Sequence, residues 1–95
     1  MPIVRELGDR DTEGTVLARI GRLYVDYNSP QSAIQSLQQS VEVRESIREQ
    51  MQQLPQSLQE SYTNFIADDY RLLAQLLRQQ NRQTEADQTL SLLKP

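Results

Sequence analysis

The chain contains no cysteine and no histidine, and these two absences exclude much of the chemistry that small proteins carry. Without them there is no disulfide, no Cys–His or Ser–His–Asp nucleophilic group, and no zinc site built on thiolate or imidazole ligands. No group of carboxylates in the sequence is spaced to converge on one point. We therefore expect a protein that is not an enzyme, with no cofactor and no metal.

Glycine and aromatic residues are also scarce, with three glycines and an aromatic content of 5% in 95 residues. Abundant glutamine and leucine favour helices over sheets. A formal net charge of −3 disfavours nucleic acid as a partner. No apolar run approaches the ~20 residues that a membrane span needs, and no signal peptide is visible at the N-terminus. We expect one small cytoplasmic domain that binds neither membrane nor nucleic acid.

Apolar residues recur at helical spacing throughout the chain and predict an all-α fold of four helices. We expect these helices at residues 10–27, 30–53, 56–79 and 83–93. The residues expected to be buried along them are Val16, Leu17, Ile20, Leu23, Tyr24 and Tyr27; Ala33, Ile34, Leu37, Val41, Ile47, Met51 and Leu54; Leu58, Tyr62, Phe65, Ile66, Tyr70, Leu73, Leu76 and Leu77; and Ala86, Leu90 and Leu93.

Residues typical of helix ends support these boundaries. Asp9 or Asp11 is the expected N-cap of the first helix, and the hydroxyl of Ser29 is the expected cap of the second. Asn28 and Asn81 suit the left-handed conformation that ends many helices. The short turns around them predict two antiparallel hairpins, at residues 9–53 and 55–95.

The two predicted hairpins carry one pattern, about 53 residues apart. The stretches that align without a gap are LARIGRLYVDYNSPQSAIQSL and YRLLAQLLRQQNRQTEADQTL. Gly21 aligns with Ala74, and Ala33 aligns with Ala86. Small residues at these places let two helices approach closely, so we expect Gly21 to meet Ala33 across the first hairpin and Ala74 to meet Ala86 across the second.

This pattern resembles the tetratricopeptide repeat, a helix–turn–helix unit of about 34 residues. Ile20 and Gly21 stand at the family's Leu-Gly pair, Tyr24 at its tyrosine, and Ala33 at its first alanine. The middle helices are longer than the family's norm. This long-helix form is similar to the last kinesin-light-chain-like repeats that precede a caspase-like CHAT domain in cyanobacterial proteins. The resemblance implies a bacterial helical-repeat scaffold, here a fragment of a larger protein, with residues 1–8 as the tail of a preceding repeat.

The resemblance also implies a concave groove, lined by the first helix of each hairpin, that binds a peptide or a partner domain. Arginines there suit a carboxylate, which indicates an acidic peptide. The alternative is a solvated face with local charge pairs. The groove residues carried over by position and retained as the candidate site are Arg19, Arg22, Asp26, Arg71, Gln75 and Arg78.

Two functions stay open at this point. The first is a non-catalytic protein–protein interaction scaffold. The second is a structural spacer or capping segment that self-associates through its long helices. Because repeat arrays are stable only when neighbouring units cover each other's apolar faces, we expect two isolated hairpins to self-associate.

Overall fold

The computed structural model describes the backbone of residues 2–94 and the side chains of residues 8–94. Four α-helices make up most of it: α1 (Pro2–Asp26), α2 (Pro30–Gln50), α3 (Gln56–Gln79) and α4 (Gln83–Ser91). A 3₁₀ helix, η1 (Met51–Gln53), joins α2 to α3. No strand occurs between residues 2 and 94, so the prediction of an all-α fold with four helices is confirmed.

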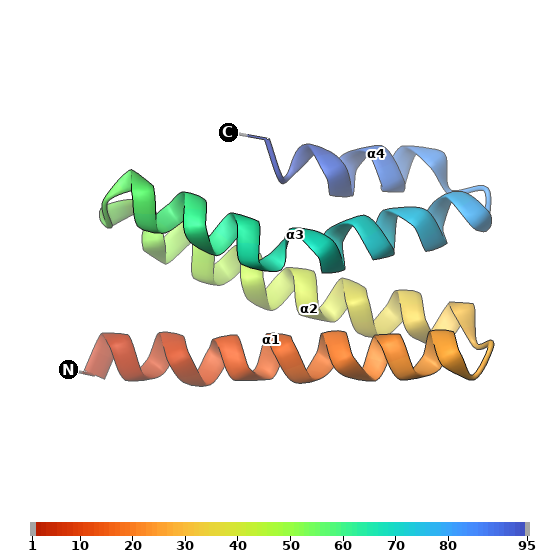
Figure 1. The fold of residues 1–95 in the computed structure, drawn as a ribbon, viewed down its shortest axis with the longest axis horizontal. Helices are drawn as coiled ribbons and strands as arrows, with labels where there is room; N and C mark the ends of the chain where they lie inside the picture. Colours follow the sequence, from red (N-terminus) through yellow and green to blue (C-terminus); the bar gives the residue numbers. More distant parts are fainter. Residues whose placement is uncertain (1, 95) are drawn as a thin grey trace.

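The helices form two antiparallel hairpins laid side by side (Figure 1). α1 pairs with α2, and α3 pairs with α4. α2 also packs against α3, so it lies between α1 and the second hairpin. The result is an elongated slab with extents of 41 × 24 × 15 Å.

The two hairpin turns have the same backbone geometry. Asn28 and Asn81 are the two described non-glycine residues with positive φ, at 59° and 61°. Each donates its N–H to the carbonyl oxygen three residues earlier, at 3.0 Å in both turns. The next N–H in each turn donates to the carbonyl oxygen five residues earlier, at 2.8 Å. The left-handed asparagines predicted at both helix ends are confirmed, and the internal repeat extends to individual hydrogen bonds.

The predicted start of the first helix and the predicted side-chain caps of the first two helices need correction. α1 runs without a break from Pro2, so Asp9 and Asp11 lie inside the helix and cap nothing. Residues 2–8 are part of α1, and no loop separates them from the first hairpin. α2 begins at Pro30 as predicted, and this residue needs no partner for a backbone N–H, but the side chain of Ser29 makes no capping hydrogen bond.

The core lies mainly where α2, α3 and α4 meet, and Ala18 of α1 belongs to it. Its buried apolar members include Ala33, Ile34 and Leu37 of α2, Leu73, Ala74, Leu76 and Leu77 of α3, and Ala86 of α4. The expected core residues Leu54, Leu58 and Phe65 are exposed. The physical reason is length: α4 is much shorter than α3 and leaves the first turns of α3 uncovered (Figure 1).

Gly21 marks the closest approach of α1 to α2. A Cβ atom added there would lie 2.8 Å from Cγ of Leu37 and 3.4 Å from the carbonyl oxygen of Ala33. The predicted meeting of Gly21 and Ala33 is therefore confirmed. Ala74 and Ala86, the matching pair of the second hairpin, are both buried in the same core cluster.

Candidate functional site

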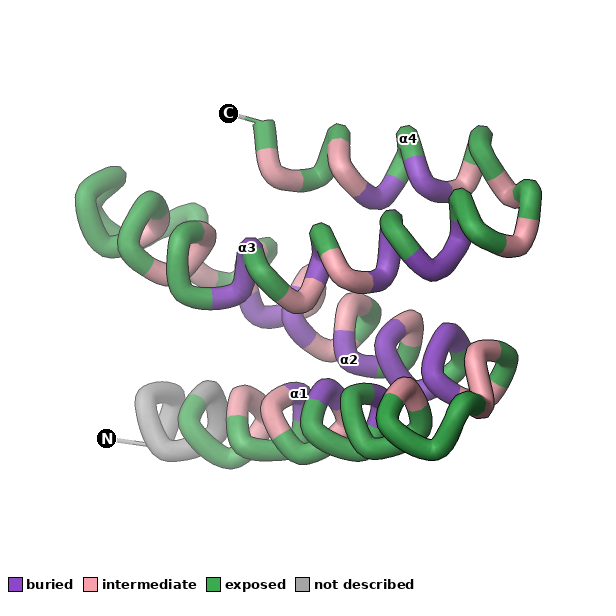
Figure 2. Tube along the Cα trace, turned by 45° about the vertical axis from the view of Figure 1, so that its right-hand side comes forward, coloured by how far each residue is buried: buried purple, intermediate pink, exposed green. Residues whose placement is uncertain are grey.

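The helix α1 has two apolar faces of different kinds. Toward α2 it presents small residues, and Gly14, Ala18 and Gly21 are buried there. Away from α2 it presents large apolar side chains that are exposed to solvent. Figure 2 shows this division, with buried segments of α1 toward α2 and exposed segments on the other side. We call the exposed set the outer face of α1: Val16, Ile20, Leu23, Tyr24 and Tyr27.

This arrangement corrects the prediction that these five residues are buried. Successive residues of an α-helix are rotated by about 100°, so Gly14, Ala18 and Gly21 share one side while Ile20 and Leu23 share the opposite side. The small residues allow the close approach to α2 and therefore take the inner side. The large residues are left outside: Leu23 is 55% exposed and Tyr27 is 78% exposed, while Leu17 at the margin is half-buried.

The second hairpin shows what an equivalent face does when it is covered. The repeat aligns the outer face of α1 with a leucine face of α3, in which Leu73, Leu76 and Leu77 are buried. These leucines share the core cluster with Ile34 of α2. In order, they correspond to Ile20, Leu23 and Tyr24. The fold thus contains one covered and one uncovered copy of the same helix face.

A polar network ties α1, α2 and α3 together on the inner side. Arg44 of α2 is only 2% exposed and donates to Oδ2 of Asp69 at 2.6 Å. Arg22 of α1 donates to Oδ1 of the same carboxylate at 2.7 Å. A Cβ on Gly14 would lie 3.2 Å from Cγ of Arg44, so the missing side chain at Gly14 provides the space that the arginine occupies.

The charges of this network determine the titration of Asp69. Burial raises the pKa of Asp69, but hydrogen bonds from Arg44 and Arg22 outweigh burial and hold the pKa below its ordinary value. The carboxylate is therefore ionised at neutral pH and accepts hydrogen bonds from two guanidinium groups. It is a structural link and not a group held ready for acid–base chemistry.

Two tyrosines extend this polar network. The hydroxyl of Tyr62 donates to Oδ1 of Asp11 at 2.9 Å, and that of Tyr70 donates to Oε2 of Glu45 at 2.6 Å. Burial, reinforced by the neighbouring carboxylate in each case, raises the pKa of both hydroxyls far above the ordinary value. Both phenols therefore stay protonated at neutral pH and act as hydrogen-bond donors between helices.

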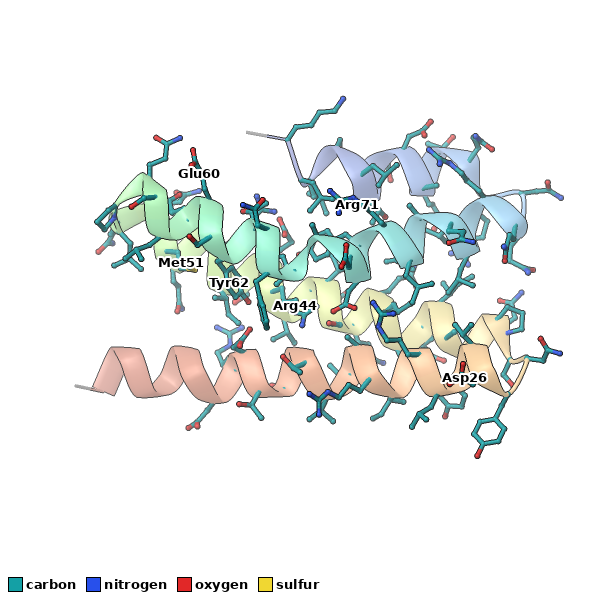
Figure 3. The ribbon with its side chains drawn as sticks, in the orientation of Figure 1. Asp26, Arg44, Met51, Glu60, Tyr62 and Arg71 are labelled. Carbon is teal, nitrogen blue, oxygen red and sulfur yellow. The ribbon has the colours of Figure 1, made fainter. Side chains whose placement is uncertain are left out.

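The structure does not gather the predicted site residues into one groove. On α1, Arg22 is engaged by Asp69, while Arg19 and Asp26 are exposed beside the outer face. Gln75 lies on α3 and lines the same cavity as Arg71 and Arg78. Figure 3 shows how far the two groups are separated, with Asp26 on α1 and Arg71 near α4.

The α3 members line a shallow cavity of about 440 Å³ that also includes Ala74, Gln79 and Leu90. Their charges are paired within the chain. Arg71 lies 3.1 Å from Asp68, one turn away, and Arg78 lies 3.6 Å from Asp87 of α4. Each of these two arginines therefore has a carboxylate neighbour within the chain.

Two further cavities of the described part of the chain are open to solvent. These two cavities, of about 380 and 340 Å³, share Arg48, Gln59 and Thr63 near the junction of α2 and α3. Within the described part of the chain, no group of three or more acidic residues is placed to hold a metal ion. None of the described helices is long and apolar enough to cross a membrane.

Sequence reasoning indicated apolar faces left without cover, but it did not identify the outer face of α1 as one of them, and it missed the buried arginine. The signal for the first was the spacing of Gly14, Ala18 and Gly21, which marks a second stripe opposite the large residues. The signal for the second was weaker, a lone arginine within the apolar stripe of α2.

Comparison with known proteins gives no match: no family model, no curated protein and no solved structure matches this chain significantly.

Proposed function

We propose that this chain is a non-catalytic protein-interaction scaffold of helical-repeat type, and that the outer face of α1 engages its partner. The observation that carries the proposal is the exposure of five large apolar side chains on one side of one helix. Apolar side chains gathered on one face of a protein mark interaction sites, and tyrosines are enriched in such interfaces. The absence of histidine and cysteine agrees with a role without catalysis.

The internal repeat supports a helix as the partner element. The matching face of α3 is covered by a helix, α2, in the same molecule. A face with the same spacing on α1 suits a helix laid along it in the same manner. This agrees with the tetratricopeptide resemblance, in which one hairpin packs on the next, and the bacterial kinesin-light-chain-like, CHAT-associated identity stays part of the proposal.

The alternative function is a spacer or cap that self-associates through its long helices. The same outer face favours it, since an uncovered repeat face on α1 is also a surface for assembly. A peptide groove built on Arg71, Gln75 and Arg78 is less well supported, because both arginines already have carboxylate neighbours in the chain.

A displayed library of helical peptides tests the proposal. Peptides selected against the purified chain are expected to perturb backbone NMR signals of residues 16–27 on binding. Leu23→Glu should weaken the selected peptides about 10-fold or more, whereas Leu92→Glu, a charge at another exposed leucine, should change affinity less than about 3-fold. Signals that move instead around Arg71, Gln75 and Arg78 would show that the groove is the binding site and contradict the proposal.

A further inference from the structure

The outer face of α1 has the spacing of a helix that pairs with another helix. Val16, Ile20, Leu23 and Tyr27 follow one another at intervals of four, three and four residues. This is the alternation of the two apolar positions in a heptad, which form the seam between paired helices. All four are exposed, and the acidic Glu13 occupies the next seam position toward the N-terminus. The seam is therefore about three turns long.

The residues beside this seam are complementary to the same residues of a second copy when the two helices run antiparallel. Arg19 and Asp26 lie on one flank, one heptad apart, and both are exposed. Leu17 and Tyr24 lie on the other flank with the same spacing. In an antiparallel pair of identical helices, residues of the same flank face each other across the seam. Arg19 of each copy then lies beside Asp26 of the other, and Leu17 lies beside Tyr24.

The seam residues agree with the same orientation. Antiparallel pairing about a point between Gly21 and Arg22 places Val16 opposite Tyr27 and Ile20 opposite Leu23. The smallest seam residue thus meets the largest. A parallel pair would instead place Tyr27 against Tyr27 and leave Arg19 facing Tyr24, without an opposite charge. Neither Arg19 nor Asp26 has an ion-pair partner among the described residues, so both are available across the seam.

We propose that a second copy of this chain docks antiparallel on the outer face of α1 and forms a two-fold symmetric dimer. The inference rests on the proposed function, because it uses the same face, and it names the partner as the chain itself. A two-fold axis uses one surface twice, which is the commonest way for identical chains to associate.

Head-to-tail stacking of copies, with α4 of one molecule on α1 of the next, is disfavoured by the outer side of α4. The residue of α4 that matches the buried Ile34 of α2 is Asp87, whose side chain is 65% exposed. Stacking would bury this carboxylate against the apolar Ile20 and Leu23, and its one ion-pair neighbour among the described residues, Arg78, lies 3.6 Å away. The free side of α4 therefore does not fit the outer face of α1, whereas a second α1 does.

The size of the seam predicts a weak dimer. Three turns of one helix from each copy bury much less than the ~1,600 Å² of a standard interface. We expect dissociation constants of about 10 to 500 µM, so dimers are populated at high protein concentration and monomers at low concentration.

Disulfide trapping tests the orientation directly, because the chain has no cysteine of its own. Val16→Cys and Tyr27→Cys proteins are mixed at high concentration and oxidised. The antiparallel dimer predicts cross-linked pairs of one protein with the other. Cross-links between two Val16→Cys chains, or between two Tyr27→Cys chains, should not form. In the antiparallel dimer the two identical cysteines would be about 16 Å apart along the helix, and a disulfide needs Cα atoms within about 7 Å. Cross-links between two identical variants would show a parallel seam and overturn the proposal. The absence of any cross-link would also overturn it.

Charge reversal provides the matched test by sedimentation equilibrium. Arg19→Glu or Asp26→Arg alone should weaken the dimer about 3- to 10-fold, and the double variant should restore it to within about 2-fold. Arg71→Glu, on the far side of the fold, is the control and should leave dimerisation unchanged. A wild-type chain that is monomeric at about 1 mM overturns the proposed dimer. If selected helical peptides still bind residues 16–27, the proposed function survives that result. If they do not bind, the dimer and the proposed function both fail.

Discussion

Replacing Gly21 with alanine tests the close packing of α1 on α2. Helix propensity alone favours alanine by about 1 kcal/mol inside a helix. The new Cβ, however, would lie 2.8 Å from Cγ and 3.2 Å from Cδ2 of Leu37. The contact is with a branch point, so relief requires a shift of Leu37 or of the helix. Overpacking of this kind costs about 1–3 kcal/mol, and we expect Gly21→Ala to lower the free energy of unfolding by about 1 kcal/mol overall.

Urea unfolding followed by far-UV circular dichroism measures this change, and Gly8→Ala is the matched control. Gly8 lies in the same helix, and a Cβ there would meet nothing within 4 Å. The same substitution should therefore raise the free energy of unfolding, by up to about 1 kcal/mol. The opposite signs of the two variants are the prediction.

A double variant isolates the contact with Leu37. Leu37→Ala alone removes a fully buried side chain and should cost about 2–5 kcal/mol. In that background the atoms nearest the new Cβ are gone, so Gly21→Ala should become stabilising. If Gly21→Ala stabilises the wild-type chain as much as Gly8→Ala does, the close approach of the two helices is refuted.

Three further predictions concern the network and the turns. Asp69→Asn should lower the free energy of unfolding by about 3 kcal/mol, because it leaves the buried charge of Arg44 without its carboxylate. Arg44→Met should lower the free energy of unfolding by less, and urea unfolding of both variants checks which loss is larger. The pKa of Asp69 in the folded chain lies below its ordinary 3.8, so its contribution to the free energy of unfolding is complete above about pH 5 and is lost as the pH falls through the folded pKa. The wild type should therefore lose more stability than Asp69→Asn when unfolding is repeated between pH 5 and pH 2. Asn81→Ala should lower the thermal midpoint by destabilising a left-handed residue by about 1 kcal/mol, whereas Asn28→Gly should leave it nearly unchanged.

The fold was largely predictable because its local signals agree with one another. Asn28 and Asn81 end their helices in the left-handed conformation expected of them, and α3 spans the residues that its periodicity predicts. The match of small residues between the two halves correctly indicated the contact of Gly21 with Ala33. These features depend on residues close in sequence or on a pattern that occurs twice.

The candidate site was not predictable in the same way. Periodicity shows that Ile20 and Leu23 share a side of a helix, but it does not show whether another helix covers that side. Burial of large residues was the natural expectation, and the small stripe of α1 took the inner position because close approach to α2 requires it. Arg44 illustrates the converse: charged side chains usually stay in solvent, and the space beside Gly14 together with Asp69 made burial possible.

The division of α1 into a small inner face and a large outer face can be measured most directly by thiol reactivity. Ala18→Cys and Leu23→Cys each introduce the chain's single thiol, at residues that are 3% and 55% exposed. At about 1 µM, where the chain is expected to be largely monomeric, the cysteine at 23 should react with a thiol reagent at nearly the rate of the unfolded protein. The cysteine at 18 should react at least about 100-fold more slowly, because its reaction requires opening of the hairpin. A protected position 23 with a reactive position 18 would contradict the account.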